Sequence, residues 1–333
     1  MSLTIALLGD VMLGRGVGAA LDSRPPESVW SPELRAITQH CDAVICNLEC
    51  CIAARGSPTR RIPGKPFFFR APPIAVESLI ALGVSAVSLA NNHALDFETE
   101  GLVETGELLE RHGIATVGAG RGPYSARRGA VIKTRRGSVG ILALADHPSE
   151  YAARRGQWGT AYADLAHELP AWAREELERL AHRADLVIAF PHWGPNMAPS
   201  PSRRRRRRAA EMLAAGATIV AGHSSHVFHG IERHGERLAI YDLGGAVDDY
   251  AVDPVLRNDR GLLALWRPDG EPELELVGLA LEYARTDCAH GEAANWIADR
   301  LSRACAELGT AIERTAENTF AVKARPIKTS GEP

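Results

Sequence analysis

The stretch LTIALLGDVMLGR, residues 3–15, opens with the first of five segments that decide the fold. In each segment a short apolar run ends directly in a polar group that can bind a ligand. Continuous apolar runs, unlike alternating ones, are typical of strands covered on both faces. The five segments are LTIALLGD (3–10), AVICNLE (43–49), AVSLANNH (86–93), LVIAFPHWG (186–194) and TIVAGHSSH (218–226).

Helical stretches alternate with these runs along the chain. Two further runs, residues 114–117 and 139–144, also predict strands, and amphipathic spacing predicts helices over 73–82, 100–112, 171–184 and 204–214. Strands alternating with helices indicate an α/β architecture built on βαβ units. Three later segments break the alternation and predict hairpins, at 130–144, 230–243 and 262–279. The sheet is therefore expected to be mixed.

The end of the chain predicts a helix and then a polar tail. Four apolar residues after Asp287 share the spacing of one helix face: Trp296, Ile297, Leu301 and Cys305. No linker rich in Pro, Gly or Ser divides the chain. We expect one domain over residues 1–285, a C-terminal helix within 286–322 packed on it, and a disordered tail over 323–333.

The polar strand ends carry the chemistry. Ligands of open α/β sheets bind beyond the carboxyl ends of the strands, so these five ends would converge if the strands are parallel neighbours. An inventory of Asp, Glu, Asn and three His favours Mn, Fe or Zn over the oxygen-only sites of Mg or Ca. Six or more ligands exceed the needs of one four-coordinate zinc. They fit two cations about 3.5–4 Å apart with a bridging carboxylate, which is a hydrolytic arrangement.

Each of these ends also has a structural interpretation. A single Asp after a strand is most often a helix cap or a turn former, and Asn91-Asn92 could serve a left-handed turn. His192 beside Trp193 could be a half-buried aromatic neighbour. His223 and His226, three residues apart beside a glycine, are harder to explain by packing. The coincidence of five such signals favours the metal site.

His93 is interpreted as a general acid that protonates a leaving oxygen. Asp96 could hold the other ring nitrogen of His93, or it could cap the helix that begins near Glu100. Arg15 lies in GDVMLGRG, where glycines let the backbone turn close to a ligand. Its guanidinium could bind a phosphate or carboxylate through two hydrogen bonds, or form a surface salt bridge.

Composition excludes several classes of function. The 333 residues are 45% hydrophobic and 24% charged, as in an average globular protein. With 38 Lys plus Arg against 41 Asp plus Glu, the formal charge of −3 argues against a nucleic-acid binder. No apolar run approaches the ~20 residues of a membrane span, and the N-terminus lacks signal-peptide features. Six cysteines without CxxC spacing support neither a disulfide framework nor a zinc knuckle. We expect a soluble cytoplasmic protein without a membrane anchor.

Seven motifs occur in one order: GDVMLGR, NLE, KPFFFRAPP, SLANNHALD, VGAGR, HWG and GHSSHVFHGIE. As an ordered set they resemble the CapA family, named for capsule and poly-γ-glutamate synthesis, within the calcineurin-like metallophosphoesterases. The resemblance covers about residues 4–248. It implies a four-layer α/β/β/α sandwich with a metal centre at the sheet edges. It also implies that His93 contacts the transferred phosphoryl group and that the metal ligands are Asp10, Glu49, Asn92, His192, His223 and His226.

Three departures from the family pattern affect the site. The wider superfamily has a histidine two residues after the first aspartate, where this chain has Met12, so one ligand of the first metal is missing. A segment usually written Leu-Gly-Asn-Phe reads LGGA at residues 243–246, after Asp242. The last two histidines are separated by two residues instead of one. Which of His223 and His226 binds which metal therefore stays open.

Three other features have two interpretations each. Six arginines at 203–208 predict a solvated helix face, or a border of the cleft that attracts anions. Cys50 and Cys51 are expected to be neutral and buried rather than soft ligands. The segment KPFFFR, residues 65–70, could be a wall over the site or an edge strand packed by aromatics. Arg70, with Arg15 and Asn91, completes the residues assigned to substrate binding.

The leading hypothesis is a metal-dependent hydrolase of the phosphoesterase type. It would use two divalent cations (Mn, Fe or Zn) and metal-activated water on a small or polymeric anionic substrate. The alternative is a CapA-like enzyme or subunit that forms or processes amide-linked, γ-glutamyl or peptide-like products. The chain has no GxxxxGK[ST] phosphate loop, which weakens an ATP-dependent ligase. A purely structural protein would leave the five polar strand ends unexplained.

Overall fold

Two mixed β-sheets form the centre of the computed structural model, which describes residues 3–322. The predicted tail at 323–333 lies outside these residues. The first sheet contains, in order, β19 (Ile312–Arg314), β20 (Thr319–Val322), β17 (Leu274–Glu282), β16 (Arg260–Trp266), β1 (Ile5–Val11), β2 (Ala43–Leu48), β5 (Ala86–Ser88) and β6 (Ala115–Val117). Beside this path, β15 (Gly245–Val247) pairs with β1, and β18 (Arg285–Cys288) pairs with β17.

The second sheet contains, in order, β13 (Ile231–His234), β14 (Arg237–Ile240), β12 (Ile219–Ala221), β11 (Leu186–His192), β9 (Ser138–Ala145) and β8 (Ala130–Lys133). Two short pairs lie apart from both sheets: β3 (Cys51–Ile52) with β4 (Arg70–Ala71), and β7 (Ala119–Arg121) with β10 (Trp158–Thr160). The strands β1, β2, β5 and β6 run parallel, as do β9, β11, β12 and β14. Their carboxyl ends therefore lie at one edge of each sheet.

Alternate residues of the central strands enter different cores. In β1, Ile5 and Leu7 face the second sheet, whereas Ala6 and Leu8 face helices. In β9, Ile141 lies in the core between the sheets and Leu142 in the core under helices on the other face. Because side chains alternate across a strand, a strand covered on both faces must be apolar throughout. This explains the continuous apolar runs of the sequence.

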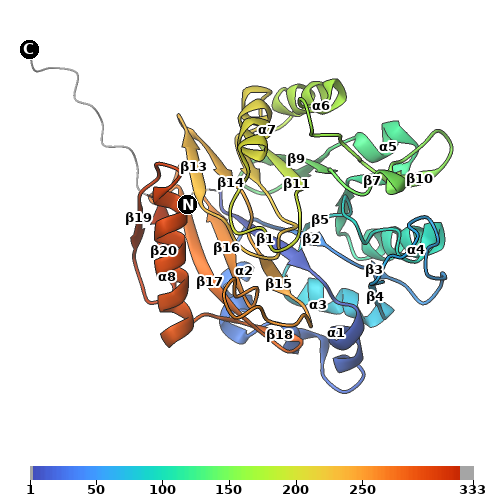
Figure 1. Cartoon of the computed structure of the whole chain (residues 1–333), viewed down its shortest axis with the longest axis horizontal. Helices are drawn as coiled ribbons and strands as arrows, with labels where there is room; N and C mark the ends of the chain where they lie inside the picture. Colours follow the sequence, from blue (N-terminus) through green and yellow to red (C-terminus); the bar gives the residue numbers. More distant parts are fainter. Residues whose placement is uncertain (1–2, 323–333) are drawn as a thin grey trace, which may run out of the picture.

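Helices cover the outer face of each sheet (Figure 1). The first sheet carries α1 (Arg15–Ala20), α2 (Pro32–Gln39), α3 (Val76–Ala81) and α4 (Glu98–Arg111). The second carries α6 (Ala171–Ala181) and α7 (Arg203–Ala214), with α5 (Pro123–Arg127) beside β7. The order helix, sheet, sheet, helix confirms the expected four-layer sandwich. The expected strands, hairpins and four internal helices are all present with small shifts of their ends.

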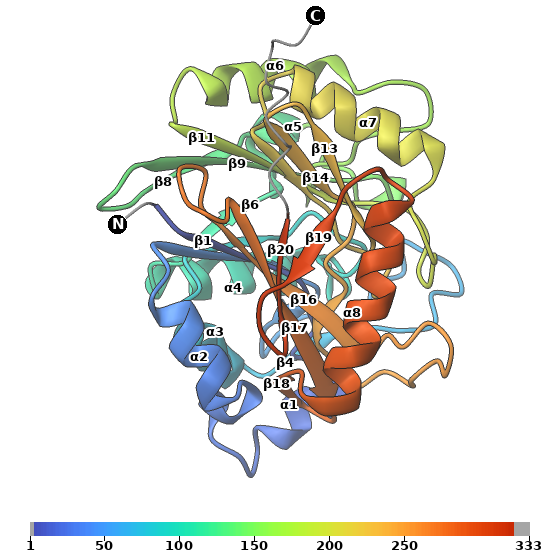
Figure 2. The same cartoon turned by 90° about the vertical axis from the view of Figure 1, so that its left-hand side faces the viewer.

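The C-terminal segment differs from the helix expected within 286–322. The helix α8 spans Gly291–Ala306, and the residues after it form β19 and β20, which extend the first sheet. Gly309, at a φ of 73°, follows the end of the helix and turns the chain back. Ile297, Leu301 and Cys305 enter the core between the sheets, so α8 closes one side of the sandwich (Figure 2).

No helix within residues 3–322 is long and apolar enough to cross a membrane.

Candidate metal centre

The five polar strand ends meet between the two sheets. Asp10 at the end of β1 is in register with Asn47 of β2, and β5 is the next strand along. In the second sheet, His192 of β11 is paired by a β-bridge with His223, just after β12. The ends therefore come from two facing sheets and not from one row of neighbours. This juxtaposition brings residues separated by more than 200 positions into contact.

Asp10 lies at the middle of the cluster and is 2% exposed. Its Oδ1 lies 3.3 Å from His223 Nδ1 and 3.7 Å from His192 Nδ1, and its Oδ2 lies 3.2 Å from His226 Nδ1. Asp10 thus belongs to two groups with metal-binding geometry, one with His192 and His223 and one with Glu49 and His226. A carboxylate shared between two groups is the arrangement that the sequence analysis expects for a pair of cations.

The donor atoms of the cluster lack protein partners. Within residues 3–322, neither carboxylate oxygen of Glu49 has a hydrogen-bond partner, although Glu49 is 1% exposed. The same holds for His192 Nε2, His223 Nε2 and Asn92 Oδ1 in this part of the chain. Buried polar groups almost always have a hydrogen-bond partner, and burying one without a partner destabilises the folded protein. Carboxylate and imidazole groups left free in one place fit divalent cations.

The electrostatics of the cluster are those of crowded buried charges. Burial raises the pKa of Asp10, but the imidazoles of His223 and His226 outweigh it and hold that pKa well below its ordinary value. Burial raises the pKa of Glu49 well above its ordinary value. Burial lowers the pKa of His226, yet Glu49 and Asp10 outweigh it and raise that pKa to about 10. Burial lowers the pKa of His192 well below its ordinary value. A bound cation would replace the proton that His226 otherwise carries.

Two asparagines form a hydrogen-bonded chain that holds the Asp10 carboxylate in place. Asn47 Nδ2 donates to Asp10 Oδ1 at 2.8 Å, and Asn91 Nδ2 donates to Asn47 Oδ1 at 3.0 Å. Asn91 also donates to the Leu48 carbonyl and accepts from the His93 amide, and it is fully buried. Its polar atoms therefore bond within the protein, and the structure places Asn91 in the interior instead of along the cleft. It ties two strand ends together.

His93 and Asp96 form a buried pair beside the cluster. His93 Nδ1 lies 2.5 Å from Asp96 Oδ2, and the His93 ring stacks on Phe69 at 3.8 Å between centroids. Asp96 also accepts from the Phe69 amide and from Tyr151, and it pairs with Lys65 Nζ at 3.1 Å. It does not cap α4, which begins after Phe97 without a side-chain cap. Burial lowers the pKa of His93 to about 4, so the free protein holds this ring neutral near pH 7.

Arg205 supports the loop that carries two of the histidines. This loop, residues 222–226, is strained, with φ values of 114° at Ser224 and 57° at His226. Arg205 Nη1 donates to Ser225 Oγ at 3.2 Å, and Asp242 Oδ2 accepts from the Ser225 amide at 2.9 Å. Both side chains are buried. The arginine run is thus neither a solvated face throughout nor a border of the cleft. Arg203, Arg204 and Arg207 are exposed, while Arg205 and Arg208 point inward.

Sequence reasoning missed Asp146 and His147. They follow β9 directly, as the polar groups follow the other five strands, and His147 lies 5.3 Å from His192 between ring centroids. Asp146 accepts from His147 Nδ1 at 2.5 Å and from the Gly194 amide. The signal is present in the sequence, because Asp146 and His147 follow the predicted strand at 139–144 after a single alanine.

A cleft of about 690 Å³ leads to the cluster and is lined by His93 and His226. Arg15 also lines it, with Nε 3.3 Å from Asp249, so this side chain forms a salt bridge and faces the cleft. Arg70 does not line it. Because β4 alternates, Phe69 and Ala71 point inward and Arg70 points outward, over Phe97 and toward the Gly56 carbonyl. The structure therefore places Arg70, which the sequence assigned to substrate binding, outside the cleft.

Met12 and the two cysteines contribute no metal ligand. Met12 is buried and its Sδ accepts from the Gly14 amide, so the position of the missing histidine is used for local structure. Burial raises the pKa of Cys51 to about 12 and that of Cys50 further. Both thiols are neutral near pH 7, as expected. The six cysteines are all free thiols.

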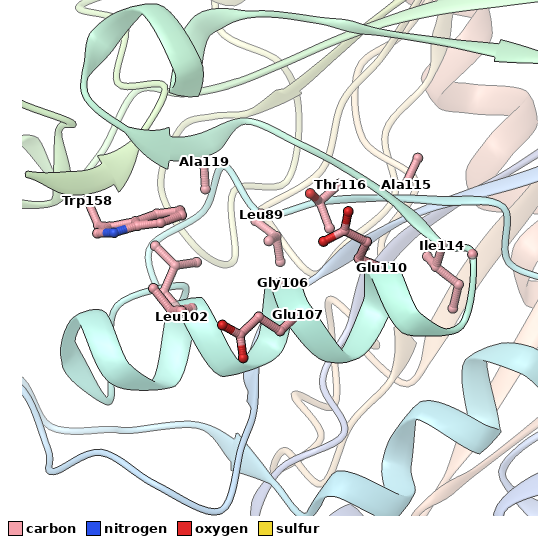
Figure 3. A pocket seen from close by; sticks show the side chains of 12 residues that line it. Leu89, Leu102, Gly106, Glu107, Glu110, Ile114, Ala115, Thr116, Ala119 and Trp158 are labelled. Carbon is pink, nitrogen blue, oxygen red and sulfur yellow. The ribbon is translucent and has the colours of Figure 1, made fainter.

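A second groove, of about 580 Å³, lies between α4 and the strands β6 and β7 (Figure 3). Trp158, Leu102 and Leu89 line it, and its acidic groups are Glu107 and Glu110. Among its lining residues there is no His, Asp or Cys. The groove therefore lacks the imidazole groups that line the cleft.

Comparisons with known proteins agree with the motifs. A probable polyglutamine synthesis accessory protein of Mycobacterium tuberculosis is 29% identical, over 99% of this chain and 98% of its own length. The PGA biosynthesis protein CapA of Bacillus subtilis is 26% identical, over 74% of this chain and 63% of its own length. Among solved structures, a phosphatase from Mycoplasma pneumoniae has 12% identity and a TM-score of 0.47, covering 87% of this chain and 93% of its own. The model of the bacterial capsule synthesis protein PGA_cap family matches residues 4–250. The chain therefore belongs to this family, the CapA family whose motifs it carries.

Proposed function

We propose that this protein is a metal-dependent hydrolase that cleaves a phosphoester at a pair of divalent cations. The observation that carries this proposal is the sharing of Asp10 between two ligand groups. The unpaired donor atoms of Glu49, His192 and His223 support it. Asn92 adds an amide oxygen from the end of the next strand. Mn, Fe or Zn suits this mixture of imidazole and carboxylate.

The residues around the cluster have distinct roles in this proposal. Bound cations would supply Lewis acidity and lower the pKa of water. Asp10 and Glu49 would hold the cations, and Asn47 orients Asp10. Because Nδ1 of His93 is held by Asp96, Nε2 is the atom that meets the leaving oxygen. The negative charge of a bound phosphoryl group opposes the effect of burial and favours protonated His93.

A second candidate comes from the relatives. The names of the Mycobacterium and Bacillus proteins refer to polyglutamine synthesis and PGA biosynthesis. The same centre could act on an amide-linked γ-glutamyl product, where the bond broken is C–N instead of P–O. A location in the cytoplasm and a small anionic substrate remain our expectations for either reaction.

Turnover assays separate the two candidates. We expect protein reconstituted with Mn, Fe or Zn to hydrolyse p-nitrophenyl phosphate or its bis ester, and Asp10→Asn to abolish this. Asp22→Asn, an exposed aspartate outside the site, is the matched control and should retain full activity. Release of glutamate from a γ-glutamyl oligomer, with both phosphoesters untouched, would favour the amide reaction instead.

A further inference from the structure

The cleft in front of the cluster is lined by aromatic and apolar side chains as well as by polar ones. We propose that its substrate is a small phosphoester whose alcohol part is flat and apolar, and that a long polyanion is a poor ligand. This inference rests on the proposed phosphoesterase function and specifies its substrate class. The residues that carry it lie on the two walls of the cleft and at its mouth.

One wall is an aromatic row that holds a cation. The Arg15 guanidinium lies 5.4 Å from the Phe67 ring centroid and 5.6 Å from that of Phe69. Phe69 is buried and stacks on His93, whereas Phe67 is 56% exposed. A guanidinium between aromatic faces is held in position at low entropic cost, ready to bind an oxyanion. The exposed Phe67 offers its free surface to the part of the substrate beyond the phosphoryl group.

The other wall is apolar near the mouth and polar near the floor. Val252, 52% exposed, and Pro254 line the outer part of the cleft with Met197. Ligand pockets are lined mainly by apolar side chains, and contiguous exposed apolar surface marks binding grooves. Deeper in, Tyr250 packs edge-on against His226 at 5.1 Å. Its hydroxyl is buried and has no hydrogen-bond partner within residues 3–322, so it is free to donate to an anionic group.

The charges around the cleft do not form a track for a polyanion. Arg15 is the only Lys or Arg among the lining residues, and Asp249 already pairs with it. Asp253 lines the mouth and adds negative charge. The other basic groups nearby are engaged elsewhere, since Lys65 pairs with Asp96 and Arg205 is buried behind the histidine loop. A chain of carboxylates entering here would meet repulsion at its second and later charges.

The test compares two phosphonates that differ only in their organic part. Isothermal titration calorimetry of the metal-loaded protein would measure binding of phenylphosphonate and methylphosphonate, which are not turned over. We expect phenylphosphonate to bind about tenfold more tightly, because the ring buries apolar surface against Phe67 and Val252. Phe67→Ala should reduce this preference to about twofold or less. Tyr124→Ala, which removes a ring that is 77% exposed on α5, is the matched control and should leave it unchanged.

Arg15→Met tests the anionic end separately. It should weaken both phosphonates by about tenfold while preserving the preference between them, because a charged hydrogen bond is lost in each complex. Equal affinity of the two phosphonates would overturn the inference and leave the phosphoesterase proposal intact. In competition with bound phenylphosphonate, a γ-glutamyl hexamer should be a weaker competitor than methylphosphonate. A hexamer that competes at a lower concentration than methylphosphonate would also overturn the inference. Failure of the metal-loaded protein to bind either phosphonate would count against both proposals.

Discussion

The support of the histidine loop by Arg205 gives a specific expectation for one substitution. In Arg205→Met the guanidinium is lost, but most of the volume of the side chain is kept. The variant removes the hydrogen bonds to Ser225 Oγ at 3.2 Å and to the Ser200 carbonyl at 3.4 Å. It also removes the planar group that lies against Gly194, where an added Cβ would come within 2.7 Å of the guanidinium carbon.

The magnitude follows from these contacts. A hydrogen bond from a charged donor contributes about 1.5–3 kcal/mol, and the longer contact contributes less. Burial lowers the pKa of Arg205, which shows that desolvation of the cation offsets part of this gain. We therefore expect a loss of about 2–3 kcal/mol in the free energy of unfolding, or about 3–4 °C in Tm. Because the loop positions His223 and His226, metal affinity should fall about 10–100-fold, as for other residues that orient metal ligands.

Two measurements separate a role in positioning from a general loss of stability. Metal affinity is measured by competition with a chromogenic chelator, and the Co²⁺ derivative is compared by its visible spectrum. The control is Arg208→Met, from the same helix, whose side chain is also buried but bonds Glu211 instead of the loop. We expect the spectrum and affinity to change in Arg205→Met alone. If Arg205→Met loses the expected free energy of unfolding but binds metal as tightly as the wild type, Arg205 does not position the histidines.

The remaining expectations concern the proton donor, its partner and pH. His93→Asn should keep the bound metal, measured by elemental analysis, but lower kcat by about 10²–10⁴-fold; an unchanged kcat would remove His93 from the reaction. Asp96→Asn should cost about 3–5 kcal/mol in denaturant unfolding because it leaves Lys65 buried without its carboxylate, and adding Lys65→Met should restore part of this loss. Burial lowers the pKa of His229. Below pH ~6.5, His229 therefore binds a proton in the unfolded chain but stays neutral in the folded protein. Stability of the metal-free protein should therefore fall as pH drops through this range, and more gently in His229→Gln; equal slopes would contradict this.

The sequence indicated the polar strand ends well where the signal was local. An apolar run that ends in Asp10 or His223 is visible in a few residues, and the ordered motifs identified which ends belong together. Sequence alone could not show that the ends come from two facing sheets, because strand pairing between distant segments is not encoded in a local pattern. The short strands β19 and β20 were missed for a related reason. They are stabilised by pairing with β17, not by a long apolar run.

The residues that the structure places away from their expected positions have physical reasons for it. Asn91 and Asn92 are adjacent in sequence and equally polar. Only the structure shows that the Asn91 side-chain amide donates hydrogen bonds to Asn47 and to the Leu48 carbonyl. Arg70 was placed by its neighbours in KPFFFR, although alternation in β4 turns it outward. Arg205 was hidden within a run of six arginines, whose burial depends on the helix face. In each case the sequence indicated the type of side chain but not the direction in which the side chain points.

The count of bound metal tests the central claim most directly. Protein reconstituted with Mn, Fe or Zn and freed of loose ions should contain about two metals per chain by elemental analysis. Asp10→Asn, which alters the carboxylate common to both ligand groups, should contain less than one. A wild-type protein that retains no metal under every condition, or an Asp10→Asn variant that retains as much as the wild type, would contradict the account.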